Sequence, residues 1–410
     1  MTNYLLPILV LLNLLPASSA ADWPQFRGPN RDDVSKETGL LKSWPKDGPP
    51  LAWQVKGLGS SYAGVSVAGD RIYTLGANGA VSKVFALERD NGKVVWSADV
   101  GPAGGELGCT PTVDGDRVYA LVGQEGDLVC LQIKDGKRVW HRNLHKEFGG
   151  SIKQWHYCES PLVDGDHVIV TPGGKDATMV ALDKKTGETV WKCAIPLEHT
   201  EAGYASAVIA EVGGVKQYVR LLDGGLAGVS TDGKPLWTYQ KLGPNINVST
   251  PIVLKDQILA VAGYGKGGAL LQLTANGKEV KAEEVYFKSE LTNKHGGVLV
   301  VGDYAYGDTD DHGQPYCAEV KSGHVMWKRE GNEGRGRRSA SVTYADGRLY
   351  FRYANGVVAL VKASPDGYKE TGSFQVKTDG EAWAHPVVVG GKLYLREQDS
   401  LYCYDVREKK

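Results

Sequence analysis

Four of the nine histidines stand in short polar stretches that recur along the chain. Imidazole can bind a metal ion or transfer a proton, so these side chains are candidates for either role. Trp155 and Trp383 lie in the same stretches and offer flat faces for stacking, and Arg335, Arg337 and Arg338 form a group suited to binding an anion. The four histidines are His156, His199, His295 and His385.

The polar stretches separate copies of a repeated unit that must position them. Residues 181–191 read ALDKKTGETVW, and similar segments occupy residues 86–96 and 130–140. Each copy predicts a strand, a turn in which glycine adopts positive φ, and a second strand that ends in tryptophan. The tryptophans recur at spacings of about 43 to 51 residues or twice that, which indicates a repeat architecture. They are Trp53, Trp96, Trp140, Trp191, Trp237 and Trp327.

The count of repeats predicts the fold. Seven units each contain four expected strands, and a last unit from about residue 385 contains only three. An orphan strand, Leu51 to Val55, precedes the first unit, so we expect it to complete the eighth blade and close the ring. The prediction is an all-β, eight-bladed propeller. Its fifth and seventh units lack the tryptophan, with Tyr286 and Phe374 as the nearest substitutes, and we expect weaker junctions there.

The chain divides into four predicted parts. Residues 1–20 form a signal peptide, because an apolar run ends in small residues suited to cleavage, and 21–49 an irregular segment lying on the body. Residues 50–406 form the propeller and 407–410 a tail. A retained amino-terminal anchor remains open, since no Lys or Arg precedes the apolar run. We expect export to the periplasm or the extracellular space, with no transmembrane segment in the mature protein.

Charge and cysteine content exclude several function classes. The 47 Lys and Arg balance 48 Asp and Glu, so nothing favours nucleic acid as a partner, and we expect a monomer. The six cysteines show no C-x-x-C motif and no adjacent pair, which argues against zinc ribbons and thioredoxin-like chemistry. Most of them are expected to be small buried hydrophobes, with a Cys109 to Cys158 disulfide as the alternative.

The repeated pattern A-L-D-x-x-T-G-x-x-x-W resembles the repeat of the PQQ-like (pyrroloquinoline-quinone) propeller family over about residues 50 to 406. The segment WPQFRGPN at residues 23–30 is similar to the start of exported single-domain members. Two relatives frame the expected function. The outer-membrane assembly lipoprotein is similar in size and has no cofactor. Quinoprotein alcohol dehydrogenases bind the quinone and calcium in the central funnel, typically beneath a disulfide between adjacent cysteines, which this chain lacks.

The loops that lead into the innermost strands should face that funnel, where propellers usually bind ligands. Polar loops are also common without any ligand, and the two interpretations are evenly balanced. Four histidines on four different blades are too far apart to share one ion, so we expect no metal, and we assign no catalytic residue. The candidate ligand-binding residues are Tyr62, Gln154, Trp155, His156, His199, Glu201, Asn247, Asn293, His295, Arg335, Arg337, Trp383 and His385.

Two functions of different class follow. The first is a noncatalytic binding or scaffold propeller that holds a protein or glycan partner on its funnel face and needs no cofactor. The alternative is a PQQ-dependent alcohol or sugar oxidoreductase with calcium, as the resemblance to quinoproteins implies.

Overall fold

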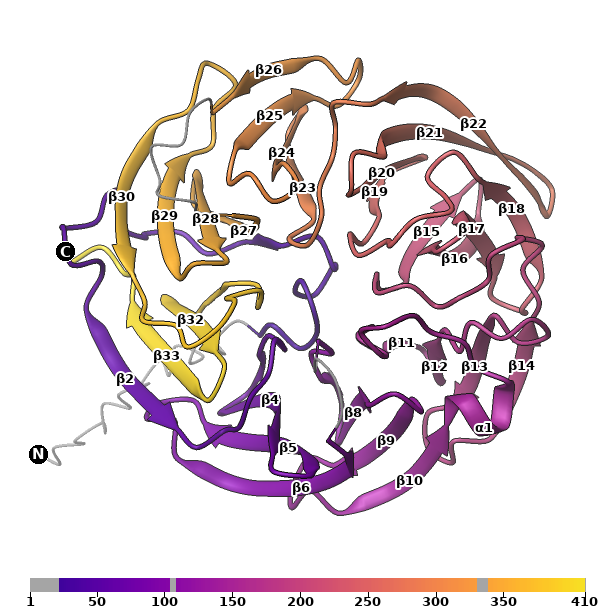
Figure 1. The fold of residues 1–410 in the computed structure, drawn as a ribbon, viewed down its shortest axis with the longest axis horizontal. Coiled ribbons are helices and arrows are strands. Elements are labelled where there is room, and N and C mark those ends of the chain that lie inside the picture. Colours follow the sequence, from indigo (N-terminus) through magenta and orange to yellow (C-terminus); the bar gives the residue numbers. More distant parts are fainter. Residues whose placement is uncertain (1–21, 104–107, 330–337, 410) are drawn as a thin grey trace, which may run out of the picture.

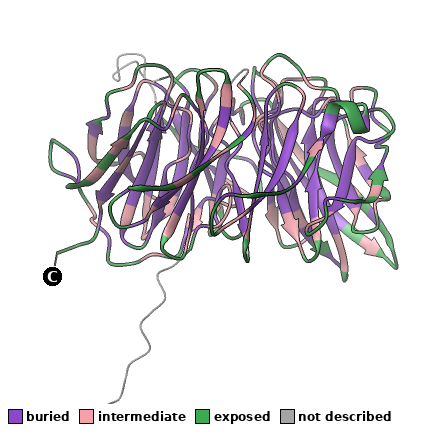
Figure 2. Cartoon of the chain, turned by 90° about the horizontal axis from the view of Figure 1, so that it is seen from below, coloured by how far each residue is buried: buried purple, intermediate pink, exposed green. Residues whose placement is uncertain are grey.

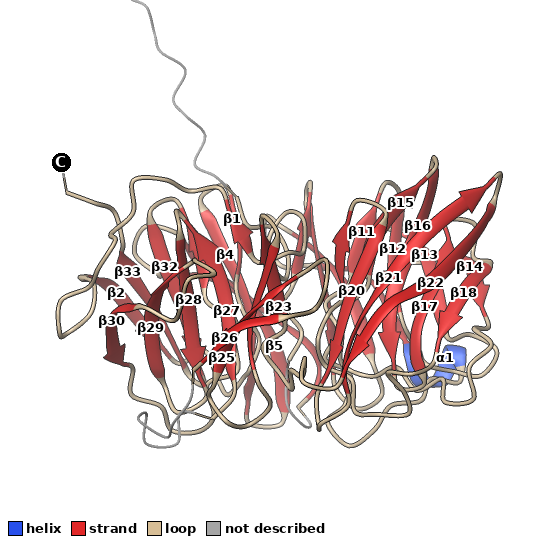
Figure 3. Ribbon diagram, turned by 90° about the horizontal axis from the view of Figure 1, so that it is seen from above, coloured by secondary structure: helices blue, strands red, loops and turns tan. Residues whose placement is uncertain are grey.

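The computed structural model describes residues 22–103, 108–329 and 338–409. These residues form eight antiparallel sheets arranged around a central opening, which confirms the eight-bladed propeller (Figure 1). Seen from the side, the molecule is a disc whose strands run between its two faces (Figures 2 and 3). The expected signal peptide and the arginines Arg335 and Arg337 lie outside the described residues.

Each blade is one sheet of four strands, and the seventh carries a short fifth strand. Blades 1 to 4 comprise β3 (Ser66–Ala68), β4 (Arg71–Asn78), β5 (Val81–Glu88) and β6 (Val94–Pro102); β7 (Thr112–Asp114), β8 (Arg117–Val122), β9 (Asp127–Gln132) and β10 (Arg138–Asn143); β11 (Leu162–Asp164), β12 (His167–Val170), β13 (Met179–Asp183) and β14 (Thr189–Cys193); and β15 (Val208–Val212), β16 (Val215–Leu222), β17 (Gly225–Ser230) and β18 (Pro235–Tyr239).

The remaining blades follow in chain order around the ring (Figure 1). Blades 5 to 8 comprise β19 (Ile252–Leu254), β20 (Gln257–Ala262), β21 (Gly267–Asn276) and β22 (Glu279–Lys288); β23 (Val298–Val301), β24 (Tyr304–Asp308), β25 (Pro315–Glu319) and β26 (Val325–Lys328); β27 (Ala340–Ala345), β28 (Arg348–Tyr353), β29 (Val357–Lys362) and β30 (Glu370–Gln375); and β31 (Val387–Val389), β32 (Lys392–Glu397), β33 (Ser400–Asp405) and β2 (Leu51–Lys56).

Burial differs between the strands of a blade for a simple reason. The two middle strands are covered on both faces by neighbouring blades, so β8 and β9 are almost entirely apolar and buried. The outermost strand is only partly covered, and β10 and β14 alternate with exposed residues. One helix occurs in the described chain, α1 (Leu144–Phe148), and it spans only five residues. No helix of the described chain has the length and apolar character needed to cross a membrane.

The ring closes as predicted. Strand β2 pairs antiparallel with β33, and Trp53 lies opposite Cys403. The final blade therefore has the order β2-β33-β32-β31, with its outermost strand supplied by the amino-terminal part of the chain (Figure 1). This pairing leaves the last blade with a complete sheet.

Five of the six repeat tryptophans join the outer part of their blade to the next one. The Trp96 indole lies over Gly136, and its Nε1 donates a hydrogen bond to the Ile133 carbonyl at 3.0 Å. The same arrangement recurs for Trp140 on Gly187 and for Trp191 on Gly233, while the Trp327 Nε1 donates to the Ser364 carbonyl and the Trp53 ring lies over Gly92. Trp237 differs, because its Nε1 donates within its own blade to Gln217 Oε1 at 2.7 Å. We call the contacts between an aromatic ring of one blade and the turn of the next blade the rim junctions.

The two units without tryptophan use different substitutes. In the fifth blade the Tyr286 ring lies over Gly323, and its hydroxyl donates to the Val320 carbonyl at 2.8 Å, so it reproduces the tryptophan contact. In the seventh blade Phe374 packs against Trp44 and Gly48 of the amino-terminal segment. The eighth blade has no turn between its two outermost strands, because β33 and β2 are not consecutive in the chain. The amino-terminal segment takes the place of that turn against Phe374.

The segment before β2 does more than lie on the body. Residues 22–35, here called the hub segment, pass through the middle of the ring and end in the two-residue strand β1 (Val34–Ser35), which pairs parallel with β27 (Figure 1). Backbone hydrogen bonds join Trp23 to Val67 of blade 1 and the Pro24 carbonyl to Val113 of blade 2. The hub segment was expected to be irregular, and the parallel pairing was not predicted.

Two buried arginines extend the hub segment to the other blades. Arg31 donates to the carbonyls of Ser160, Pro161 and Ala207, on blades 3 and 4. The Arg27 guanidinium donates to the Thr250 carbonyl at 3.2 Å and the Val298 carbonyl at 2.5 Å, on blades 5 and 6, and pairs with Asp33 at 2.5 Å. With β1 on blade 7 and Asp33 bonded to His385 before blade 8, the segment contacts all eight blades.

Candidate functional site

An open pocket with a cavity volume of about 110 Å³ lies at the centre of the ring. Its walls come from the loops that precede the innermost strands, and Phe26 of the hub segment also lines it. Five of the residues proposed from the sequence line this pocket together: Tyr62, Trp155, His295, Trp383 and His385. We call this space the funnel pocket.

Aromatic side chains form two groups in the funnel pocket. The Trp383 ring lies between Tyr62, with ring centroids 4.6 Å apart, and His295, which stacks on it at 4.5 Å with an interplanar angle of 21°. On another wall Trp155 packs against Tyr204 at 5.4 Å, and the Trp155 backbone N–H donates to the Tyr204 hydroxyl at 3.2 Å. Such flat, rigid faces suit the binding of an apolar or ring-shaped group.

The two histidines of the pocket are not in equivalent environments. Burial lowers the pKa of His295 from its ordinary value of 6.5 to about 4, and the positive charge of Lys294 adds to this shift. Its Nδ1 lies 3.0 Å from the Ser339 hydroxyl. His385 shares a hydrogen bond of 3.1 Å with the Asp33 carboxylate and meets the Phe26 ring edge-on at 4.9 Å. His295 is therefore neutral near pH 7, and His385 is fixed to the hub segment.

The described lining of the funnel pocket carries no acidic or basic side chain other than histidine, since it contains no Lys, Arg, Asp or Glu. Arg338, which belongs to the arginine group singled out above, pairs with Glu381. The chemistry that the described residues offer is stacking and apolar contact, with hydrogen bonds from Thr110, Ser160 and Ser206.

Several proposed ligand residues have other surroundings. Asn247 and Asn293 are buried, and their side-chain amides donate to the backbone carbonyls of Leu222 and Asp308 at 2.7 and 2.8 Å, so they brace loops. Gln154 is exposed. His156 has a positive φ of 63°, and its buried Nδ1 has no hydrogen-bond partner. None of these four residues lines the funnel pocket.

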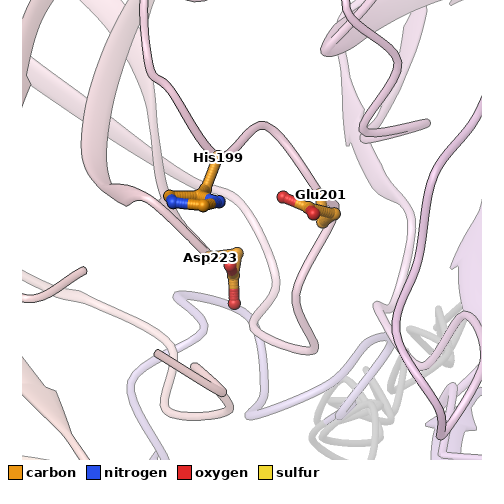
Figure 4. A group of neighbouring side chains, drawn as sticks. All are labelled: His199, Glu201 and Asp223. Carbon is orange, nitrogen blue, oxygen red and sulfur yellow. The ribbon is translucent and has the colours of Figure 1, made fainter. Parts of the chain in front are cut away.

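His199 and Glu201 belong to a different group of side chains. They meet Asp223, and one potential ligand atom from each residue lies within 4.8 Å of the others (Figure 4). Asp223 comes from the turn between β16 and β17, so reasoning from the loops before the innermost strands missed it. The sequence signal for this position is an aspartate followed by two glycines, which indicates a tight turn that could approach a neighbouring loop. We call these residues the His-Glu-Asp cluster.

The cysteines form no bridges in the structure. All six are free thiols, and only Cys158 is not fully buried. Burial raises the pKa of the Cys109 thiol to about 12. The six thiols thus behave as small apolar side chains in the fold, and the structure contains no Cys109 to Cys158 disulfide.

Comparison with known proteins connects this architecture to a family. A family model described as outer membrane protein assembly factor BamB matches residues 45–125 and 80–329. The chain is 26% identical over 366 residues to the outer membrane protein assembly factor BamB of Burkholderia pseudomallei, covering 84% of each sequence.

Two solved structures show the same fold. BamB from Moraxella catarrhalis superposes with a TM-score of 0.64 at 17% identity, covering 87% of this chain and 99% of that one. Quinohemoprotein alcohol dehydrogenase from Comamonas testosteroni gives 0.63 at 14% identity, covering 96% and 82%. The sequence match covers more than half of the chain, and the ring of eight four-stranded blades agrees with it. This protein therefore belongs to the PQQ-like repeat propeller family whose model is described as outer membrane protein assembly factor BamB.

Proposed function

We propose that this protein is an exported, noncatalytic scaffold that holds a protein partner by accepting an aromatic or aliphatic side chain in the funnel pocket. The observation that carries the proposal is the lining of that pocket. Two groups of aromatic rings face an open space, and the described lining has no charged side chain to bind an ionic substrate. Interface anchors in proteins are typically buried aromatic and aliphatic groups of this kind.

The histidines support a binding role better than a catalytic one. A general acid or base works best when its pKa lies near the working pH. The pKa of His295 is about 4, so its imidazole is neutral and cannot donate the extra proton near pH 7. The Nδ1 atom of His385 shares a hydrogen bond with Asp33 of the hub segment, and this bond joins the hub segment to the eighth blade.

The oxidoreductase alternative demands a different pocket. Pyrroloquinoline quinone is a tricarboxylate, and burying it requires cationic side chains or a metal ion to balance its charge. The described lining of the funnel pocket supplies neither Lys nor Arg, and His295 is neutral. The described residues therefore do not fit this cofactor, and we derive no redox step for the protein.

Export and partner class follow from the same reasoning. The apolar run and small residues within 1–20 support a secretory signal. The family is described by a factor of outer membrane protein assembly, which supports a periplasmic scaffold with a protein partner. Aromatic faces also stack on sugar rings, so a glycan is the outcome of the test that would redirect the proposal.

A cofactor titration separates the two functions. The purified protein is mixed with pyrroloquinoline quinone and calcium, and quinone absorbance is followed as the cofactor is added. We expect no saturable change. A stoichiometric signal that Trp383→Ala abolishes would overturn the scaffold proposal in favour of the oxidoreductase.

Crosslinking in cells tests the partner directly. A photoreactive amino acid replaces Tyr62 or Trp155 in the funnel pocket, and Val190 on the exposed outer strand β14 serves as the matched control. We expect the two pocket positions to capture the same protein, and the β14 position not to capture it. Capture of polysaccharide alone, or equal crosslinking from all three positions, would contradict a protein partner at this face.

A further inference from the structure

The His-Glu-Asp cluster stands beside the funnel pocket and is not used by the proposed function. His199 and Glu201 lie on the loop between β14 and β15, and Asp223 lies on the turn between β16 and β17. Tyr204 of the funnel pocket follows Glu201 by three residues on the same loop. We propose that His199, Glu201 and Asp223 bind one divalent transition-metal ion of the zinc or manganese type.

The donor set suits such an ion. Imidazole nitrogen and carboxylate oxygen together are typical ligands of Zn²⁺, and carboxylates also suit Mn²⁺. The ligand atoms lie within 4.8 Å of one another, so a small movement of the side chains brings all three onto one ion. Three protein ligands leave at least one position of a tetrahedral ion open for water or for a donor from a partner.

An orphaned oxygen provides independent support. The Oε2 atom of Glu201 is buried and has no hydrogen-bond partner. A buried carboxylate oxygen without a partner is costly, and a bound cation would satisfy it. Asp223 is buried as a whole residue, with an exposed fraction of 1%, whereas Glu201 is half-buried, with its Oε2 shielded from solvent.

Charge in the cluster is only partly balanced. The Lys153 ammonium lies 2.7 Å from Asp223 Oδ2, and it is the one ion-pair partner recorded for these two carboxylates among the described residues. Because the Lys153 side chain is 40% exposed, it can move into solvent when a divalent ion enters.

The backbone holds the ligands in place without the ion. The Gly224 N–H donates to the His199 carbonyl at 3.0 Å, and the Asp223 N–H donates to the Glu201 carbonyl at 3.3 Å. A Cβ at Gly224 would stand 2.4 Å from the His199 carbonyl oxygen, so only glycine permits this close approach. Thr200, between the two ligands, donates its hydroxyl to the Gly173 carbonyl. Such pre-organisation lowers the entropic cost of binding.

Metal binding would act on the neighbouring pocket. The loop with Lys153 also carries Trp155, and the loop with Glu201 also carries Tyr204. These two aromatic residues pack together in the funnel pocket. An ion at the cluster would therefore fix the wall against which the proposed partner packs, although its binding requires no partner.

The test is metal titration of the untagged, mature protein after removal of metals with a chelator. Isothermal titration calorimetry with Zn²⁺ and with Mn²⁺ is expected to show one ion per chain for at least one of the two, with Mg²⁺ and Ca²⁺ binding more weakly. His199→Ala, Glu201→Gln and Asp223→Asn should each weaken binding of that ion by about 10-fold to 100-fold. His324→Ala, an exposed histidine on a distant turn, is the matched control and should change nothing.

A second variant guards against loss of folding. Lys153→Met removes the competing ammonium and should strengthen Zn²⁺ binding by several fold. Zn²⁺ should then raise the melting temperature of this variant more than that of the unaltered protein. Weak binding of several ions that Glu201→Gln does not affect would overturn the proposal, as would a Lys153→Met variant that binds no metal. Both results are obtained without any partner, so they are independent of the scaffold function.

Discussion

The rim and the hub of this propeller are held together by different means. At the rim junctions, tryptophans lie on glycine turns of the next blade and make the same contact again and again. At the hub, one non-repeating segment contacts every blade, and Arg27 and Arg31 donate to backbone carbonyls of blades 3 to 6. The rim divides stability among many similar contacts, whereas the hub concentrates it in a few buried charges.

Removal of Arg27 should show the largest effect. Arg27→Ala leaves the Asp33 carboxylate buried without its guanidinium and frees the Thr250 and Val298 carbonyls. Breaking a buried ion pair in this way costs about 3 to 5 kcal/mol, which urea unfolding would measure. The control Arg71→Ala removes an exposed pair with Asp70 and should cost about 0.5 kcal/mol or less. Similar losses in both variants would remove the distinction between hub and rim.

A methyl group at a rim junction should have the next largest effect. At Gly136, with φ of 72°, a Cβ would stand 2.6 Å from the Trp96 ring, so Gly136→Ala combines backbone strain with overpacking. We expect a loss of about 2 to 4 kcal/mol in the free energy of unfolding. Gly115 has a φ of 56° and open space around it, so Gly115→Ala introduces backbone strain without overpacking and serves as the control. It should cost about 1 kcal/mol. Equal losses of stability in Gly136→Ala and Gly115→Ala would show that the Trp96 indole moves aside without cost.

Acid should destabilise the fold at the funnel pocket through His295. Its folded-state pKa of about 4 lies below the unfolded value of 6.5, so the unfolded chain binds more protons between these values. The contribution is complete above pH 6.5 and is lost as the pH falls toward 4. Between pH 7 and pH 5 it should remove about 1 to 2 kcal/mol, and His295→Phe should flatten this part of the unfolding profile. An unchanged profile would contradict the buried, neutral imidazole.

The smallest effect should come from the substituted rim junction. Tyr286→Phe keeps the ring over Gly323 but removes the hydrogen bond to the Val320 carbonyl. The expected loss is about 1 kcal/mol, and Trp191→Phe should lose a similar amount because it also removes a donor, the one that reaches Thr231. Thermal unfolding of both variants checks this. A loss much larger in Tyr286→Phe would mean that the two contacts are not equivalent.

The contrast between rim and hub also explains what the sequence could predict. Tryptophans such as Trp53 and Trp96 recur about every 43 to 51 residues, so the sequence predicts the blades, their number and the ring closure through β2. Residues 22–35 occur once and have no periodicity, and two partners of Arg27 are backbone carbonyls more than 200 positions away, those of Thr250 and Val298. Nothing local in the sequence indicates such contacts.

The candidate site shows the same division. Tyr62, Trp155, His295, Trp383 and His385 come from corresponding loops, and the structure brings them to one pocket. Asn247 and Asn293 come from corresponding loops as well but turn inward to brace the backbone, a choice made by packing. Asp223 approaches His199 from another turn because Gly224 lets two backbones touch, which loop-by-loop reasoning does not reveal.

The hub segment also sets an order of assembly. It precedes every blade in the chain, yet its contacts include His385, just before the last blade. The contact with His385 can form only after blades 1 to 7 have been synthesised, so the hub segment, which precedes them all, is among the last parts of the fold to complete its contacts. A chain that stops short of the eighth blade would leave β2 without β33 and Asp33 without His385, so an incomplete product would expose an unpaired strand edge far from the site of truncation in the sequence.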